Sequence, residues 1–173
     1  MHVLIDTNVV LDVLLNRYPF AYDAITIFKL PESVAYKYIS ASAVTDIYYI
    51  AYRELRDKQK VKDIIIRLLS IIHIADISEE DILFALNSDW NDFEDSVQNA
   101  VAESHNFDAI ITRNSADFKK SNVNILSRKI FCNSFQKIKY TRSTCVRYTS
   151  RYTTAIAGSV PASCCKKPVP AVH

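Results

Sequence analysis

Apolar positions along the first 131 residues follow two spacings, and the alternation between them predicts the class of fold. Short apolar runs of the kind that form buried strands occupy residues 3–5, 34–40, 71–75, 108–112 and 123–126. Between these runs, apolar residues recur every three or four positions, as in helices packed on a core, at residues 9–14, 20–30, 42–55, 60–69, 82–86 and 92–104. Strands separated by helices predict an α/β fold, a three-layer α/β/α sandwich around a central parallel sheet.

Polar residues at the starts of the predicted helices support these boundaries. Ser42 is expected to cap the third helix, and Ser78 with Asp81 forms a capping-box pattern before the fifth. Asp92 is placed to cap the sixth helix. Asn114 is expected to cap a further helical turn after the fourth strand.

Composition and charge divide the chain at residue 131. The 173 residues are 49% hydrophobic, enough for one sizeable core, and no apolar run reaches the roughly 18 residues of a membrane span. Residues 1–131 hold 14 basic and all 19 acidic side chains, a net charge of −5, whereas residues 132–173 hold 7 basic and no acidic ones, a net charge of +7. We therefore predict one cytoplasmic domain over residues 1–131, followed by a basic tail over 132–173.

The predicted tail has two interpretations. It could be a basic arm that binds RNA and stacks bases on its tyrosines, or a poorly ordered extension of doubtful origin, which the abrupt change in composition favours. The spacing of its four cysteines, Cys132, Cys145, Cys164 and Cys165, matches no zinc site. We assign the tail no chemistry, and expect a chain ending near Ser127 to fold.

Four acidic residues stand where strands end or helices begin. Asp6 directly follows the first predicted strand, and Asp46, Asp95 and Asp117 occupy comparable positions. Each carboxylate taken singly could simply be favoured by a helix start, by about 0.3–1 kcal/mol. In a doubly wound sheet, however, strand ends and the following helix starts share one edge. The four carboxylates are therefore expected to cluster there, and their mutual repulsion predicts a bound cation.

The chemistry of this predicted cluster indicates a nuclease. Carboxylates without convergent cysteine or histidine favour Mg²⁺ or Mn²⁺, and His2, His73 and His105 are scattered enough to be packing or surface residues. Carboxylate-bound ions are the usual apparatus for hydrolysing phosphodiester bonds. A dinucleotide-binding fold and a P-loop are both excluded, because the only glycine is Gly158, in the tail.

Four segments carry a family resemblance: residues 4–12, 39–49, 92–98 and 111–118. In their sequence and in their order along the chain, they resemble the PIN domain of VapC-like toxins, over about residues 2–127. The resemblance implies an α/β/α sandwich, a metal-dependent ribonuclease activity, an antitoxin partner and a homodimer. It also implies that Asp6, Asp46, Asp95 and Asp117 are the catalytic metal ligands, although the second acid is often glutamate in this family.

Residues beside the four acids take supporting roles in the same resemblance. Thr7 and Asn8 would shape the first turn, and Thr112 and Asn114 would hydrogen-bond to ligands or water. Arg113, next to the fourth acid, is our candidate for a contact with a substrate phosphate.

Helical spacing distinguishes between neighbouring acids in two segments. We favour Asp95 over Glu94 as the third ligand, because we assign Phe93 and Val97 to the buried stripe and expect Glu94 to point outward. Asp12 is likewise expected to face solvent.

A basic cluster lies between two predicted helices, close to three tyrosines. It consists of Arg53, Arg56, Lys58, Lys60 and Lys62, with Tyr48, Tyr49 and Tyr52. The cluster could be a rim that follows RNA phosphates, or a solvated helix end with packed tyrosines. The leading hypothesis is thus an endoribonuclease toxin that hydrolyses RNA, and the alternative is a PIN-like scaffold that binds RNA or protein without cutting.

Overall fold

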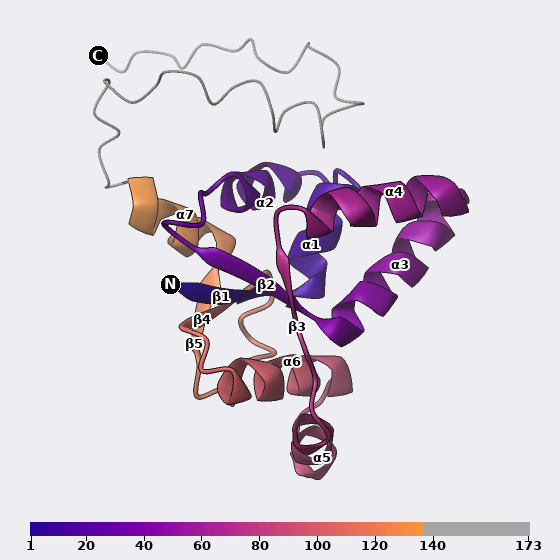
Figure 1. Cartoon of the computed structure of the whole chain (residues 1–173). Helices are drawn as coiled ribbons and strands as arrows, with labels where there is room; N and C mark the ends of the chain where they lie inside the picture. The colour runs from indigo at the N-terminus through magenta and orange to yellow at the C-terminus, as the bar shows by residue number, and fades with distance from the viewer. Residues whose placement is uncertain (137–173) are drawn as a thin grey trace, which may run out of the picture.

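The computed structural model describes residues 1–136, in which five parallel strands form one sheet in the order β3-β2-β1-β4-β5 (Figure 1). The strands are β1 (His2–Ile5), β2 (Tyr36–Ser40), β3 (His73–Ala75), β4 (Ala109–Thr112) and β5 (Asn124–Ser127). The helices are α1 (Thr7–Leu14), α2 (Ala21–Phe28), α3 (Ala41–Leu55), α4 (Lys58–Leu69), α5 (Glu79–Asn87), α6 (Phe93–Ser104) and α7 (Arg128–Gln136). The predicted three-layer α/β/α sandwich is confirmed.

Alternating side chains of the strands build a core on each face of the sheet. On β1, Val3 and Ile5 pack with α1, α2, α3, α4 and α7, whereas Leu4 between them packs with α5 and α6. Figure 1 shows the same division, with α5 and α6 on the face opposite α1, α2 and α7. Both faces of the central strands are therefore covered, which explains why their sequences are continuously apolar.

The order of the strands places a crevice at one edge of the sheet. β1 pairs with β2 on one side and with β4 on the other, so the chain reverses its direction of winding beside β1. In open α/β sheets, ligand sites lie outside the carboxyl ends of the strands at such a switch point. We call this side of the molecule the carboxyl edge.

Local capping agrees with the sequence at α5 and α6 but differs at α3, and the segment after Asn114 is a turn rather than a helix. The predicted capping box of Ser78 and Asp81 is present, and Asp92 caps α6. At α3 the cap is Ser40 rather than Ser42: the Ser40 hydroxyl oxygen accepts a hydrogen bond from the Ala43 amide at 3.2 Å. The helix begins earlier than predicted because β2 runs into it without a loop.

The C-terminal end of the described region differs most from the prediction. Helix α7 runs across the boundary drawn at residue 131, and Phe131 is 0% exposed within the core. The amide of Ile130 donates to the hydroxyl of Ser127, the last residue of β5. The folded unit therefore extends past both Ser127 and residue 131. The rest of the predicted tail, from residue 137, lies outside the described residues.

None of the helices within residues 1–136 is long and apolar enough to cross a lipid bilayer.

Candidate functional site

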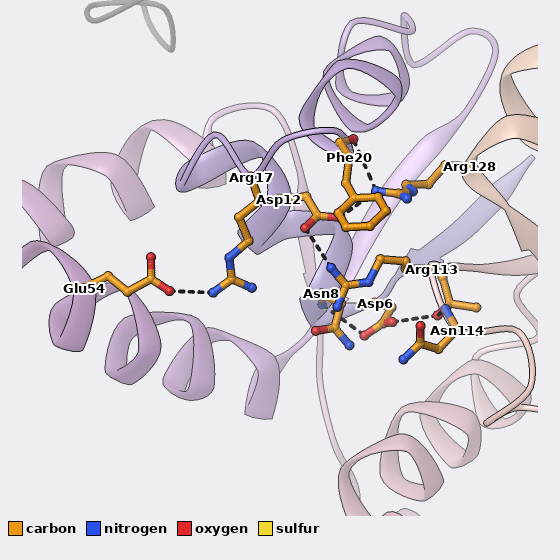
Figure 2. Close-up of polar contacts among 10 residues, drawn as sticks. Asp6, Asn8, Asp12, Arg17, Phe20, Glu54, Arg113, Asn114 and Arg128 are labelled. Carbon is orange, nitrogen blue, oxygen red and sulfur yellow. Dashed lines mark hydrogen bonds and ion pairs between the residues drawn. The ribbon is translucent and has the colours of Figure 1, made fainter.

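Asp6 stands at the centre of the carboxyl edge. It follows β1, caps α1, and is 1% exposed. Its Oδ1 accepts a hydrogen bond from the Asn8 amide at 3.2 Å, and its Oδ2 accepts one from the Thr112 hydroxyl of β4 at 2.7 Å (Figure 2). Burial raises the pKa of Asp6 despite these hydrogen bonds. The carboxylate is thus rigidly held, and each oxygen keeps a further lone pair.

Thr112 and Asn114 act together beside Asp6. The Thr112 hydroxyl that donates to Asp6 also accepts a hydrogen bond from the Asn114 amide at 2.9 Å. The hydroxyl has a single hydrogen, which it donates to Asp6, while the bond from the Asn114 amide holds the hydroxyl oxygen in place. The segment after β4 therefore fixes Asp6 from the neighbouring strand.

The first turn of α6 brings two further carboxylates to Asp6. Burial, together with the negative charges of Asp6, Asp92, Asp117 and Glu94, raises the pKa of Asp95 from 3.8 to about 7. Two of the other predicted ligands, Asp6 and Asp117, therefore lie close enough to Asp95 to repel it. Asp117 is exposed, in the turn after β4, so the cluster opens to solvent on that side.

Glu94 occupies the space between Asp6 and Asp46. Its Oε1 accepts a hydrogen bond from the Thr7 hydroxyl at 2.6 Å and one from the Gln98 amide at 3.4 Å. Burial raises the pKa of Glu94, and the charges of Asp46 and Asp6 raise it further. Our expectation that Glu94 points outward is wrong, because the side chain is half-buried and faces the cluster.

Asp46 joins the cluster through Glu94. It lies on the second turn of α3, where burial raises its pKa. Its charge acts on Glu94, but it is not among the groups that shift Asp6 or Asp95. The structure thus forms one chain of carboxylates, from Asp117 and Asp95 through Asp6 and Glu94 to Asp46.

The donor set of this chain suits a hard divalent cation. All of its acidic groups offer oxygen, and their mutual repulsion would be relieved by positive charge. The Oε1 atom of Gln98, buried beside Glu94, has no hydrogen-bond partner within the described part of the chain. Among the side chains that the structure describes, those of residues 1–132, no three acidic, histidine or cysteine groups are arranged to hold a metal ion.

A second charged group borders the site through Arg113. Asp12 is 0% exposed, and its carboxylate accepts hydrogen bonds from Arg113 Nη1 at 3.2 Å and from Arg128 Nη1 at 2.6 Å (Figure 2). Both guanidinium groups lie over the ring of Phe20. The prediction of a solvent-facing Asp12 is therefore wrong: two arginines from distant segments enclose it.

The two misplaced acids had different signals in the sequence. Glu94 stands three and seven positions before Val97 and Val101, so it belongs to the same buried stripe, whereas Phe93 is 51% exposed. Asp12 lies in a short helix with apolar residues on every side, which indicates a buried acid that needs a partner. The partners themselves, Arg113 and Arg128, could not be found without the fold.

Comparisons with known proteins agree with this architecture. The family model of the PIN domain matches residues 2–116. No curated protein matches the chain. Among solved structures, VapBC2 from Rickettsia felis, bound to a DNA fragment from its promoter, is 17% identical with a TM-score of 0.59, over 73% of this chain and 98% of that one.

Two other solved structures share the fold. A toxin–antitoxin complex from Klebsiella pneumoniae is 21% identical with a TM-score of 0.56, over 73% of this chain and 97% of that one. VapC20 from Mycobacterium tuberculosis, a toxin that cleaves the sarcin–ricin loop, is 14% identical with a TM-score of 0.52, over 62% of this chain and 86% of that one. The family model covers more than half of the sequence, and the chain therefore belongs to the PIN domain family.

Proposed function

We propose that this protein is a Mg²⁺- or Mn²⁺-dependent endoribonuclease, the toxin of a toxin–antitoxin pair. One observation supports the metal more than any other: burial, and then the negative charges of neighbouring carboxylates at the carboxyl edge, raise the pKa of Asp95 to about 7. Such repulsion destabilises the fold when nothing binds there, so a cation that neutralises it is the simplest reason for the arrangement.

In this proposal Asp6, Asp46, Asp95 and Asp117 hold the metal, and Glu94 is added to them. Asp6 is the fixed ligand, because Thr112 and the Asn8 amide already orient it. The half-buried Glu94 and Asp95 carboxylates, which lie beside Asp6, would supply further oxygen ligands. When bound, the ion supplies an activated water and stabilises the leaving oxygen of the phosphodiester.

Arg113 is proposed to hold the phosphate that is cleaved. Its side chain is 26% exposed, and only one of its nitrogens bonds to Asp12. The remaining N–H groups are free to donate to phosphate oxygens, which a planar guanidinium binds well. Arg128 still neutralises the buried Asp12 when Arg113 turns to substrate, so no charge is left unpaired.

We also propose two protein partners, an antitoxin and a second copy of the chain. A similar fold occurs in the toxin–antitoxin complex from Klebsiella pneumoniae, which supports the first. For the second, α5 carries exposed Leu83, Phe84 and Leu86, with exposed Phe93 following on α6. Adjacent exposed apolar side chains of this size are typical of interfaces. Light scattering with Leu86→Lys tests the dimer: the variant is expected to be monomeric.

Cleavage of structured RNAs tests the proposed activity. The full chain is expected to cut RNA with Mn²⁺, to lose this activity in EDTA, and to regain it when Mn²⁺ is restored. Asp6→Asn and Asp95→Asn should be inactive, whereas Asp63→Asn, at an exposed acid of α4, should cut normally. Activity that ignores EDTA or survives Asp6→Asn would contradict the mechanism. RNA binding without Mn²⁺ uptake or cleavage would favour the scaffold.

A further inference from the structure

One flank of α3 carries polar and aromatic side chains from the candidate site to the corner between α3 and α4. Asp46, Tyr49 and Arg53 stand at spacings of three and four residues, so they lie on one side of the helix, away from buried Ala43, Ile47 and Ala51. Arg56 follows directly as the C-cap of α3, in the left-handed conformation. We call Asp46, Tyr49, Arg53 and Arg56 the α3 flank. The flank is about 15 Å long.

The direction of α3 makes this flank a path out of the site. The helix begins at the end of β2, and Figure 1 shows it extending from the sheet to the corner where α4 begins. Asp46, near its start, interacts electrostatically with Glu94 of the candidate site. A chain that leaves the carboxylates along α3 would therefore meet Tyr49 first, and then Arg53.

The charges along the flank are available for a ligand. No carboxylate of residues 1–136 forms an ion pair with Arg53 or Arg56. The acids next to these arginines in the sequence, Glu54 and Asp57, have other partners. Glu54 pairs with Arg17 at 2.7 Å, and Asp57 caps α4 by accepting a hydrogen bond from the Lys60 amide at 3.0 Å. The exposed lysines at 58, 60 and 62 add to the positive charge. The corner therefore favours a polyanion.

Tyr49 adds a second kind of recognition. Its side chain is 61% exposed, and the Arg53 guanidinium lies 5.9 Å from the centre of its ring. A tyrosine and an arginine placed together in this way offer flat surfaces on which an unpaired nucleobase can stack. A paired base in a duplex cannot reach such a surface, because its faces are covered by its neighbours.

We propose that the α3 flank binds a single-stranded segment of RNA next to the cleaved bond, with a base stacked on Tyr49 and phosphates held by Arg53 and Arg56. The inference rests on the proposed ribonuclease function and adds to it the residues of this chain that hold the strand beside the cut. An acidic peptide offers negative charge without bases, so a test can distinguish binding of RNA from binding of an acidic peptide.

Binding in EDTA tests the inference apart from cleavage. The full chain is mixed with a fluorescein-labelled 12-nucleotide RNA, single-stranded or annealed to its complement, and anisotropy is measured against salt. We expect tighter binding to the single strand. Tyr49→Ala should weaken that binding by about five- to fifty-fold, and Tyr49→Phe should preserve it. Arg53→Gln should lower the slope of log K against log salt by about 0.7.

Matched controls and the cleavage assay separate this inference from the function on which it rests. Tyr22→Ala removes a tyrosine that is 80% exposed on α2, and should bind as the unaltered chain does. Equal losses in Tyr49→Ala and Tyr22→Ala, equal binding of duplex, or equal competition by polyglutamate would overturn the inference. If binding depends on Tyr49 but the chain does not cleave RNA in Mn²⁺, only the proposed nuclease function is overturned. If the chain cleaves RNA and Tyr49→Ala leaves cleavage unchanged, only the proposed binding by the α3 flank is overturned.

Discussion

Neutralising Asp95 should stabilise the metal-free protein, and only at neutral or alkaline pH. The folded state raises the pKa of Asp95 from 3.8 to about 7, so near pH 5 the folded chain holds a proton that the unfolded chain has lost. This contribution to stability is fully present below pH 4 and is lost as the pH rises toward 8. Asp95→Asn removes the ionisable group, so the variant does not lose this stability as the pH rises.

The magnitude follows from the size of the pKa shift. A change from 3.8 to about 7 corresponds to at most about 4 kcal/mol, at about 1.4 kcal/mol for each tenfold change in proton affinity. Asp95 is only half-buried, so water screens part of its interaction with neighbouring carboxylates. We therefore expect Asp95→Asn to raise the free energy of unfolding by about 2 kcal/mol at pH 8, and by almost nothing at pH 4.

Urea unfolding in EDTA at pH 4, 6 and 8, followed by circular dichroism, measures this difference. Asp63→Asn is the matched control, because Asp63 is exposed and accepts a hydrogen bond only from Gln59. Added Mn²⁺ should stabilise the unaltered chain at pH 8 more than it stabilises Asp95→Asn. The reasoning is refuted if Asp95→Asn and Asp63→Asn have the same stability at pH 8, or if the gain from Asp95→Asn is as large at pH 4.

Three further variants test other parts of the structure. Asp12→Asn leaves two arginines around a neutral side chain and should lower the free energy of unfolding by about 3 kcal/mol. Glu54→Gln, at the exposed pair with Arg17, should lower it by less than about 1 kcal/mol. Equal urea midpoints for the two variants would show that the buried ion pairs of Asp12 do not stabilise the fold. A chain ending after Ser127 loses Phe131 from the core and should be at least about 3 kcal/mol less stable than one ending at residue 136. Equal melting temperatures of the two chains would show that Phe131 does not stabilise the fold. Thr112→Val removes the hydroxyl that orients Asp6 and should weaken Mn²⁺ binding about tenfold in calorimetry, with an unchanged affinity speaking against that role.

The sheet and most helices could be predicted because their signals are local. The apolar run that ends at Ile5, followed directly by a helical pattern, fixes β1, α1 and the position of Asp6 at a strand end. Helix α7 was missed because the change in composition at residue 131 suggested that the fold had ended. Its local signal was Ser127 as a cap, followed by apolar residues at 131, 132 and 135.

The candidate site could be predicted less completely, because its details depend on contacts between distant segments. That Asp6 and Thr112 lie together follows from parallel neighbouring strands, and their hydrogen bond has the expected partners. The inward turn of Glu94 depends on Thr7, which is 87 positions earlier in the sequence. The engagement of Arg113 by Asp12 spans 101 positions. No periodicity within either segment reports such contacts.

The central claim is that the carboxylates at the carboxyl edge hold a divalent metal ion, and crystals soaked in Mn²⁺ test it most directly. An anomalous difference map should show a peak about 2.0–2.3 Å from oxygens of Asp6 and at least one of Glu94 and Asp95. The peak should vanish in crystals of Asp6→Asn. A map without a peak at this edge, or with manganese bound only elsewhere on the molecule, would contradict the account.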